Sequence, residues 1–226
     1  MFTRYGLCSG PSEDIKEVQG FREAFEHLQG LVFEAGCLLA AACQPFASSY
    51  LSDSSLSLAD LIRSSPIAKA RLLHYFPPSP DASLPAEDEP VDSWCGFHKD
   101  HGLLTGLCSA MYLQQQPHGP PSVVNAPSSS SGLYIRTRGG ELTKVSIPID
   151  CLAFQTGEAL ELATAGKLRA TPHCVRVGSA PGADRISRET FALFMQPKTE
   201  QQLTQTENFG QFSKRIFDEH YGQATM

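Results

Sequence analysis

Long apolar runs and an excess of basic residues are both missing from this sequence of 226 residues. A membrane-spanning helix needs roughly 20 consecutive apolar residues, and the longest run here, from Gly36 to Cys43, is far shorter. The 24 acidic residues outnumber the 18 basic ones, which gives a formal net charge of -6. Proteins that bind duplex nucleic acid normally present a basic face to the phosphates. We therefore expect a soluble protein with no membrane and no nucleic acid among its partners.

The cysteine patterns of disulfide-rich and zinc-binding proteins are missing as well. The seven cysteines are odd in number and include no C-x-x-C pair. Most of them lie in apolar stretches, where a reduced cysteine packs as a small hydrophobic side chain. No secretory leader is evident at the start of the chain. These thiols favour a reducing compartment, and we expect the cytoplasm as the default location.

The first part of the chain has a helical pattern. From Asp14 to about Ala42, apolar residues recur at steps of three and four with charged residues between them. This periodicity predicts an amphipathic helix with one buried stripe. A second, short helix is expected around Ser57 to Ile62, and Phe209 to Tyr221 has the pattern of a closing helix. The helices therefore lie at the two ends of the sequence.

After residue 66 the pattern changes to short apolar runs separated by glycine and proline, which is typical of strands and turns. Gly139 and Gly140 lie between two such runs and predict a tight hairpin. The expected strands cover Ala70–Phe76, Leu103–Leu113, Tyr134–Arg138, Leu142–Ile147, Cys151–Gln155, Ala170–Val177 and Phe191–Met195. A helix followed by many short strands predicts an antiparallel sandwich or barrel with helical support.

These patterns divide the chain into three parts. We expect residues 1–66 to form an N-terminal helical support, residues 67–198 the β core, and residues 199–226 a connector with the closing helix. Within the core, residues 114–132 are low in complexity, and we expect them to form an inserted loop that does not pack. The proline-rich and acidic segment from Pro77 to Pro90 is expected to be a second loop.

The most informative short run for chemistry is WCGFHKDHGLLTGL, from Trp94 to Leu107. Residues two apart in a strand share a face, so His98 and Asp100 would present an imidazole and a carboxylate side by side. A third ligand must come from another strand, and His173 in ATPHCVRV is the candidate. Two neutral imidazoles and one carboxylate leave positions open on a metal ion, as in non-haem Fe(II) oxygenases.

Ordinary structural explanations compete with this metal site. An H-x-D pair often arises by chance, and an isolated histidine such as His173 is more often a satisfied or exposed side chain. His101 is a rival of His98 as a ligand, although in an extended strand it would face the other way. Glu158 and Glu161 can bind metals, but we expect them to face solvent or to pair locally in a turn and strand. The residues taken alone leave both explanations open.

The sequence around these residues resembles the Fe(II)/2-oxoglutarate-dependent oxygenase superfamily, specifically its isopenicillin N synthase-like branch. HKDHGLLTGL is similar to the family's H-x-D-x-G-x-L-T segment, and ATPHCVRV supplies the distal histidine. GLYIRTRGGELTKVSIPIDCLAFQTGEALELATAGKL resembles the central hairpin and the G-[DE]-x-L-E-x-x-T-x-G run. RISRETFALFMQP resembles the R-x-S-x-x-x-F ending, and RLLHYFPPSP resembles the N-Y-Y-P-P-C-P strand. The similarity runs from Arg71 to Pro197 in the family's order.

The resemblance implies a mainly β fold with supporting helices, built on a double-stranded β-helix (jelly roll) core. It implies that His98, Asp100 and His173 are the catalytic residues that bind Fe(II), and that Arg185, helped by the Ser187 hydroxyl, binds the distal carboxylate of 2-oxoglutarate. Arg185 and Ser187 are two apart and share a face, and a guanidinium offers the planar fork that a carboxylate needs. The implied enzyme is a dioxygenase that uses Fe(II), 2-oxoglutarate and O2 to oxidise a small organic substrate, by default through hydroxylation, with release of succinate and CO2.

Departures from the family's pattern keep other functions in view. The tyrosine of the N-x-Y motif, which commonly holds the C1 end of 2-oxoglutarate, is Phe76 here, and phenylalanine donates no hydrogen bond. The family's usual N-terminal region is missing, so we expect an open pocket or a wall supplied by a partner. The alternatives are a catalytically impaired jelly-roll binding module, an iron oxidase that does not use 2-oxoglutarate, and a cupin-like metal protein. The sequence predicts neither the oligomeric state nor the identity of the substrate.

Overall fold

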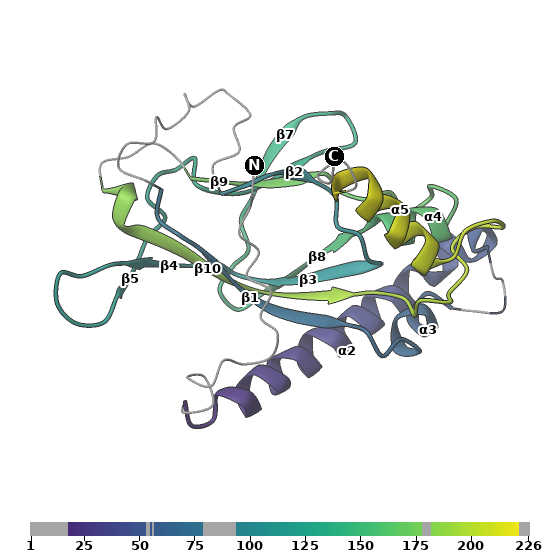
Figure 1. The fold of residues 1–226 in the computed structure, drawn as a ribbon, viewed down its shortest axis with the longest axis horizontal. Helices are drawn as coiled ribbons and strands as arrows, with labels where there is room; N and C mark the ends of the chain where they lie inside the picture. The colour runs from purple at the N-terminus through teal and green to yellow at the C-terminus, as the bar shows by residue number, and fades with distance from the viewer. Residues whose placement is uncertain (1–17, 53–54, 56, 79–93, 178–181, 222–226) are drawn as a thin grey trace.

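A computed structural model describes residues 18–52, 55, 57–78, 94–177 and 182–221 of the chain (Figure 1). The described strands form two antiparallel sheets that face each other, and helices surround one end and one outer face. The predicted start of the first helix at Asp14 and most of the Pro77 to Pro90 loop lie outside the described residues. The antiparallel sandwich expected from the strand pattern is confirmed.

The major sheet has six strands in the order β5-β4-β10-β3-β8, and β1 pairs with β10 beside that path. These strands are β1 (Lys69–Tyr75), β3 (Leu104–Cys108), β4 (Met111–Gln114), β5 (Ser122–Val124), β8 (Leu152–Thr156) and β10 (Ile186–Met195). The long β10 pairs with β1 on one side and with β4 and then β3 on the other. Strand β10 therefore joins β1 on one side to β3 and β4 on the other.

The minor sheet has four strands in the order β2-β9-β6-β7. They are β2 (Cys95–His98), β6 (Gly132–Arg136), β7 (Leu142–Val145) and β9 (His173–Arg176). The predicted hairpin joins β6 to β7, and its turn holds Gly140 at a φ of 87°, a left-handed conformation that favours glycine. Because β2 and β9 are neighbours, two segments far apart in the sequence lie side by side in this sheet.

Alternation along β10 separates the hydrophobic core from the space between the sheets. Phe191, Leu193 and Met195 point into the core, whereas the residues that alternate with them line a cavity between the two sheets; these are Thr190, Ala192 and Phe194. This is the expected consequence of the two-residue period of a strand. One strand thus contributes to both the packing and the candidate site.

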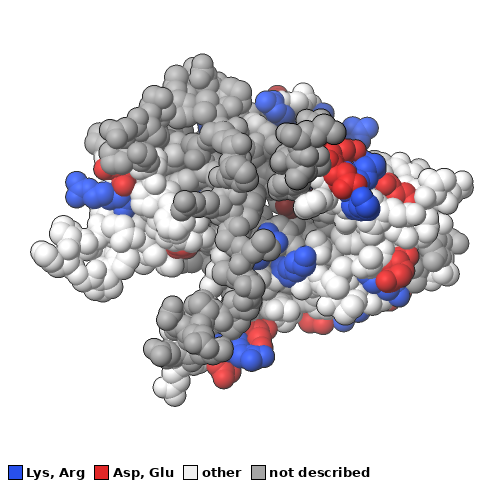
Figure 2. Space-filling view, in the orientation of Figure 1, with Lys and Arg blue, Asp and Glu red and all other residues white. Residues whose placement is uncertain are grey.

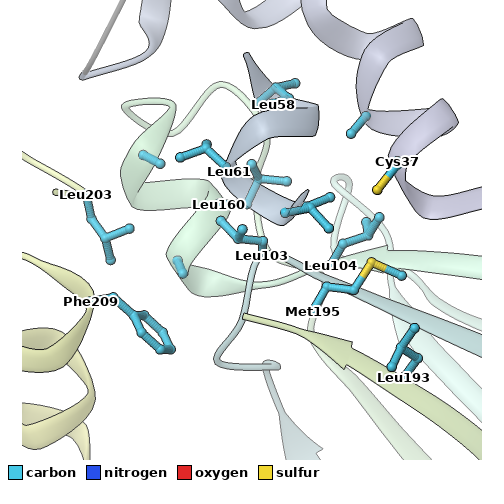
Figure 3. Packing of buried hydrophobic residues seen from close by; sticks show 14 of the residues in the cluster. Cys37, Leu58, Leu61, Leu103, Leu104, Leu160, Leu193, Met195, Leu203 and Phe209 are labelled. Atoms are coloured by element: carbon cyan, nitrogen blue, oxygen red, sulfur yellow. The ribbon is translucent and has the colours of Figure 1, made fainter. Parts of the chain in front are cut away.

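The helices pack against the major sheet. Helix α2 (Phe21–Ala47) crosses its outer face, and the 3-10 turn η1 (Ser48–Tyr50) follows it (Figure 1). The shorter helices are α3 (Leu58–Arg63), α4 (Glu158–Ala163) and α5 (Phe209–Tyr221), and η2 (Ala183–Arg185) precedes β10. Leu61 of α3, Leu160 of α4 and Leu103 lie together in the core (Figure 3). This packing holds α4 firmly at the end of the sheet where the candidate site lies.

The segment Phe21–Tyr50 is long and apolar enough to cross a membrane by length and composition alone. The core helix of a globular protein meets the same criterion, however. Here the buried side of the helix, which includes Val32, Cys37 and Ala40, belongs to the hydrophobic core under the major sheet. The length and composition of this helix therefore add little evidence for a membrane.

Three details differ from the sequence expectations. Residues 114–132 do not form an entirely unpaired loop, because Ser122–Val124 form β5 and pair with β4. The run from Leu103 to Leu113 forms two strands, β3 and β4, which pair in succession with the long β10. The run after Gly157 forms helix α4 where a turn and strand were expected. Alanine, leucine and glutamate are good helix formers, and the acidic residues lie in the first turn, where they suit the helix dipole.

Candidate metal centre

The structure brings together the three side chains that the sequence predicted as metal ligands. His98 ends β2 and lies directly across from His173 at the start of β9, with the two imidazole rings 4.2 Å apart. Asp100 follows two residues after His98, and its Oδ1 lies 3.9 Å from the Nε2 atom of each histidine. The candidate ligand atoms all lie within 4.8 Å of one another. One metal ion between them would contact all three.

Hydrogen bonds orient both imidazoles toward the carboxylate. The Nδ1 atom of His98 lies 2.8 Å from the carbonyl oxygen of Gly96, and the Nδ1 atom of His173 lies 3.0 Å from that of Thr171. A carbonyl oxygen accepts only, so each Nδ1 carries the proton and donates. In the neutral ring this leaves Nε2 without a proton, which is the state that binds a metal.

The Asp100 carboxylate is held through the oxygen that does not face the histidines. Its Oδ2 accepts hydrogen bonds from the Thr105 hydroxyl at 2.6 Å and from the Gln155 amide at 2.5 Å. The same amide nitrogen lies 3.1 Å from Nε2 of His173. Sequence reasoning did not assign a role to either residue. Thr105 was visible as the threonine of the H-x-D-x-G-x-L-T segment, whereas no motif pointed to the side chain of Gln155.

Backbone hydrogen bonds from the start of α4 support the turn that carries Asp100. The Glu158 amide donates to the Asp100 carbonyl at 2.8 Å, and the Ala159 amide donates to the Gly102 carbonyl at 3.1 Å. This close approach depends on Gly157, because a Cβ atom there would lie 2.3 Å from the Gly102 carbonyl oxygen. The turn after β2 is therefore fixed by the helix as well as by the sheet.

The two histidines differ in their affinity for protons. Burial lowers the pKa of His98, but hydrogen bonds to Cys95 and Gly96 and the charge on Asp100 outweigh it and raise the pKa to about 9. Burial, together with the positive charge on His98, lowers the pKa of His173. A divalent metal ion would displace the proton from His98. Two nitrogen donors and one carboxylate oxygen on one side of the ion suit Fe(II) and leave positions open for other ligands.

A cavity of about 250 Å³ extends from these residues between the two sheets. Arg188 of β10 lines it and is only 6% exposed. Its Nε and Nη1 atoms are buried, and none of the described residues offers either of them a hydrogen-bond acceptor. Its guanidinium carbon lies 5.2 Å from the centre of the Tyr75 ring. A buried cation with unpaired donors is costly, so this end of the cavity is suited to an anionic ligand.

Arg185 and Ser187, the predicted 2-oxoglutarate pair, are not brought to this cavity. Arg185 is exposed in η2, and Ser187 is buried on the other face of β10, where its hydroxyl donates to Glu189 at 2.7 Å. Neither residue lines the cavity. The physical reason is the strand period, since Ser187 and its neighbour Arg188 must face opposite sides.

The sequence carries a second match to the same ending, three residues later. RISRETF fits R-x-S-x-x-x-F with Arg185 and Ser187, and RETFALF fits the same spacing with Arg188 and with Thr190 as the hydroxyl residue. Only the second pair lines the cavity. The pattern is therefore compatible with two registers on β10, and only the second register brings an arginine to the cavity.

The tyrosine expected at position 76 also has a counterpart at a neighbouring position of the sequence. Phe76 is 66% exposed and does not line the cavity, and His74 pairs with Glu189 at 2.8 Å. Tyr75 instead lines the cavity, opposite Arg188 in the β1–β10 register. Burial, only partly offset by Arg188, raises the pKa of Tyr75 to about 12, so its hydroxyl stays protonated. Tyr75 therefore offers the cavity the hydroxyl hydrogen-bond donor that Phe76 lacks.

The remaining candidates lie at the edge of the site. His101 also lines the cavity, but its ring stacks on Phe212 of α5 at 4.6 Å, and its Nδ1 lies 3.9 Å from Glu158. Glu161 lies 3.5 Å from the Lys99 ammonium and accepts a hydrogen bond from the Ala170 amide. None of these three belongs to the metal-ligand group found among the described residues.

Comparison with solved structures gives several similar folds. A protein from Shewanella oneidensis designated an oxygenase has a TM-score of 0.65 at 18% identity, covering 97% of this chain and 69% of its own. A 2OG-Fe(II) oxygenase family protein from Caulobacter crescentus has a TM-score of 0.62 at 20% identity, covering 97% and 65%. A full-length Neurospora crassa protein, solved in complex with alpha-KG and thymine, has a TM-score of 0.58 at 16% identity, covering 94% and 60%.

No protein-family model and no curated protein matches the chain. The chain spans between 60% and 69% of the length of the three similar structures. At identities of 16% to 20% the likeness concerns the fold, and it covers almost all of this chain. The chain therefore has the jelly-roll fold of the Fe(II)/2-oxoglutarate oxygenases.

Proposed function

We propose that this protein is an Fe(II)- and 2-oxoglutarate-dependent dioxygenase that oxidises, by default hydroxylates, a small organic substrate and releases succinate and CO2. The observation that carries the proposal is Arg188, a buried guanidinium in the same cavity as the three candidate ligands, whose Nε and Nη1 atoms have no acceptor among the described residues. 2-Oxoglutarate has a keto acid end that chelates a metal and a second carboxylate that fits an arginine fork. Its two ends match the two ends of this cavity.

Each part of the cavity then has a role. His98, Asp100 and His173 would hold Fe(II), and Arg188 would bind the distal carboxylate of 2-oxoglutarate. Thr190 and Tyr75 line the cavity on the same strand faces as Arg188, and each brings a hydroxyl group to that end. When bound, Fe(II) and 2-oxoglutarate together supply the activation of O2 and two of the electrons that its reduction requires.

The protein contributes positioning and a dry environment. Thr105 and Gln155 keep the Asp100 carboxylate turned toward the histidines, so the ligand set is arranged before any ion binds. The apolar side chains of Leu107, Leu133 and Val175 line the cavity and exclude water from the space beside the metal. Specificity for the substrate would arise from the rest of this wall.

Two of the alternatives would leave Arg188 unexplained. An iron oxidase that does not use 2-oxoglutarate, or a binding module with a relic site, would have no ligand to satisfy the two buried Arg188 donors that lack an acceptor among the described residues. The similar fold from Neurospora crassa was solved with alpha-KG and thymine, a small molecule. That structure supports a small-molecule substrate for this chain as well.

An anaerobic titration tests the proposal. Fe(II) is added to the purified protein, followed by 2-oxoglutarate, and the visible charge-transfer absorption that a 2-oxo acid produces on ferrous iron is recorded. We expect the absorption to appear and to saturate, and succinate to form once O2 is admitted. Bound iron without this absorption would contradict the use of 2-oxoglutarate.

A further inference from the structure

The described wall of the cavity is unusually basic for an acidic protein. The chain has a net charge of -6, yet Asp100 is the one acidic residue among those that line the cavity. The basic residues that line it are Lys69, Arg71, Lys99 and Arg188. Figure 2 shows blue Lys and Arg atoms at the centre of the face in view, whereas nearer α5 blue and red atoms lie side by side. Among the described residues, basic side chains therefore outnumber acidic ones in the wall of this cavity.

Two of these four cations already have a partner or a proposed ligand. Lys99 lies 3.5 Å from a carboxylate oxygen of Glu161, and Arg188 is the proposed partner of 2-oxoglutarate. Lys69 and Arg71 form no ion pair with any acidic side chain of the described ranges. Both come from β1, whose alternate residues face the cavity.

The structure also places Lys69 and Arg71 on the same sheet face as the metal end. Lys69 pairs with Phe194 of β10, and Phe194 pairs in turn with Thr105, which holds the metal ligand Asp100. Two strand spacings, roughly 10 Å, therefore separate Lys69 from Thr105. The guanidinium of Arg71 lies over the Phe194 ring, 5.1 Å from its centre. Because Phe194 pairs with both Lys69 and Thr105, this cation also lies over the strand between those two residues.

Among the described residues, the formal charges of the loaded site leave these two cations uncompensated. The two positive charges of Fe(II) and the one on Arg188 balance the single charge of Asp100 and the two of 2-oxoglutarate. Lys69 and Arg71 then keep their positive charges at the side of the cavity. Apolar residues, among them Leu73, Leu107 and Ile147, line the same space. An apolar substrate body with one charged end would complement this surface.

We infer that the substrate is a small organic anion, whose carboxylate or phosphate group binds Lys69 and Arg71 while the carbon to be oxidised lies beside the metal. This inference rests on the proposed dioxygenase function and narrows its substrate class. The arginine fork accepts two oxygens of such a group, and the lysine adds a third donor. A neutral substrate of the same shape would leave both cations unpaired.

Binding of three matched probes tests the inference without turnover. Ligand-observed NMR compares phenylacetate, phenyl phosphate and the neutral phenylacetamide on the full chain, with and without saturating 2-oxoglutarate. We expect at least one anion to bind roughly tenfold or more tightly than the amide, in keeping with a charge-assisted hydrogen bond. The anion with the higher affinity shows whether the site prefers a carboxylate or a phosphate.

Paired variants assign the preference to these residues. In Lys69→Gln/Arg71→Gln the affinities for anion and amide should become equal. The control Arg138→Gln/Lys198→Gln removes the same charge from exposed positions that do not line the cavity, and it should keep the preference. Equal binding of acid and amide by the unmodified protein, including no binding by either, would overturn the inference.

Two further outcomes would also overturn it. The preference for the anion surviving in Lys69→Gln/Arg71→Gln would assign the anion to another site. Displacement of the anion by 2-oxoglutarate would mean that the anion binds Arg188.

The failure of the proposed function can be told apart from the failure of this inference, because the probes are measured by binding alone. A preserved preference for the anion together with no charge-transfer absorption would contradict the proposed function and would still support the anion site.

Discussion

The two ends of the cavity are built differently. At the metal end, the atoms of the three ligands that do not face the ion are already held, since both Nδ1 atoms bond to carbonyl oxygens and Oδ2 of Asp100 accepts two hydrogen bonds. At the other end, the Nε and Nη1 atoms of Arg188 are buried without an acceptor among the described residues. The protein therefore satisfies the hydrogen bonds at the metal end with its own groups, whereas at Arg188 a ligand would have to supply the acceptors.

This difference has an energetic meaning. Preorganised ligands lower the cost of binding an ion, because little rearrangement is needed. A buried donor without an acceptor costs about 1–3 kcal/mol, and more for a charged group. That cost is recovered when a carboxylate binds, so 2-oxoglutarate should stabilise the folded protein as well as occupy the site.

Removing a metal ligand should have the largest effect and should be confined to the metal end. His173→Ala deletes one of two nitrogen donors, and we expect iron affinity to fall by at least about a hundredfold, beyond the effect usual for supporting residues. Iron content after desalting, together with succinate production, measures it. His118→Ala changes an exposed histidine outside the ligand group and should retain iron. Normal turnover by His173→Ala would mean that another histidine binds the metal.

Replacing Arg188 should weaken the binding of 2-oxoglutarate without lowering the stability of the folded protein. Arg188→Met should weaken 2-oxoglutarate binding by roughly tenfold to a hundredfold, the value of one charge-assisted pair. Without 2-oxoglutarate the same variant should be as stable as the original protein or more so, because it loses a buried charge with two donors that no described residue satisfies. The charge-transfer titration and urea unfolding measure the two effects.

Arg185→Met is the matched control for that experiment, since Arg185 is exposed three residues earlier. We expect it to leave 2-oxoglutarate affinity unchanged. If Arg185→Met weakened the binding of 2-oxoglutarate and Arg188→Met did not, the carboxylate partner would be the residue that the motif first suggested.

Loosening the support of Asp100 should have a smaller effect, again at the metal end. Thr105→Val keeps the shape of the side chain but removes the hydrogen bond to Oδ2, and iron affinity should fall by about tenfold. Competition with a metal chelator measures this change. Thr143→Val, at an exposed position of β7, makes the same substitution away from the site and serves as the control. Equal iron affinities in the two variants would show that the hydrogen bond has no role in metal binding.

The smallest effect is expected from the Tyr75 hydroxyl. Tyr75→Phe should weaken 2-oxoglutarate binding by roughly twofold to tenfold, the range for one neutral hydrogen bond, and leave iron affinity unchanged. The charge-transfer titration gives both values. Phe76→Leu alters the neighbouring exposed residue and should have no effect on either. An unchanged 2-oxoglutarate affinity in Tyr75→Phe would remove this residue from the binding site.

Much of the fold was predictable because it depends on local patterns. The short helix near Ser57, the closing helix after residue 208 and the hairpin at Gly140 all follow from periodicity, caps and turn residues. The short β5 was missed because Ser122–Val124 lie in a proline- and serine-rich stretch whose composition suggests a loop. Its pairing with β4 depends on the neighbouring strand rather than on its own sequence.

The candidate site was predictable in part, for a similar reason. Donor type and the H-x-D spacing made His98, Asp100 and His173 candidates, and the resemblance of the surrounding sequence to the oxygenase family implied that they are the metal ligands. Gln155 was missed, although it contacts both Asp100 and His173, because a glutamine on a neighbouring strand has no signature in the sequence.

The sequence by itself therefore determined the class of fold and the three candidate metal ligands, and it pointed to the strand that carries the arginine proposed to bind 2-oxoglutarate. Only the tertiary structure showed that Arg188 rather than Arg185, and Tyr75 rather than Phe76, lines the cavity. Side chains alternate along a strand, so a shift by an odd number of residues moves a side chain to the opposite face. Which face borders the cavity depends on how β1 and β10 pair with each other and pack beneath the minor sheet, and those contacts are made between residues far apart in the chain.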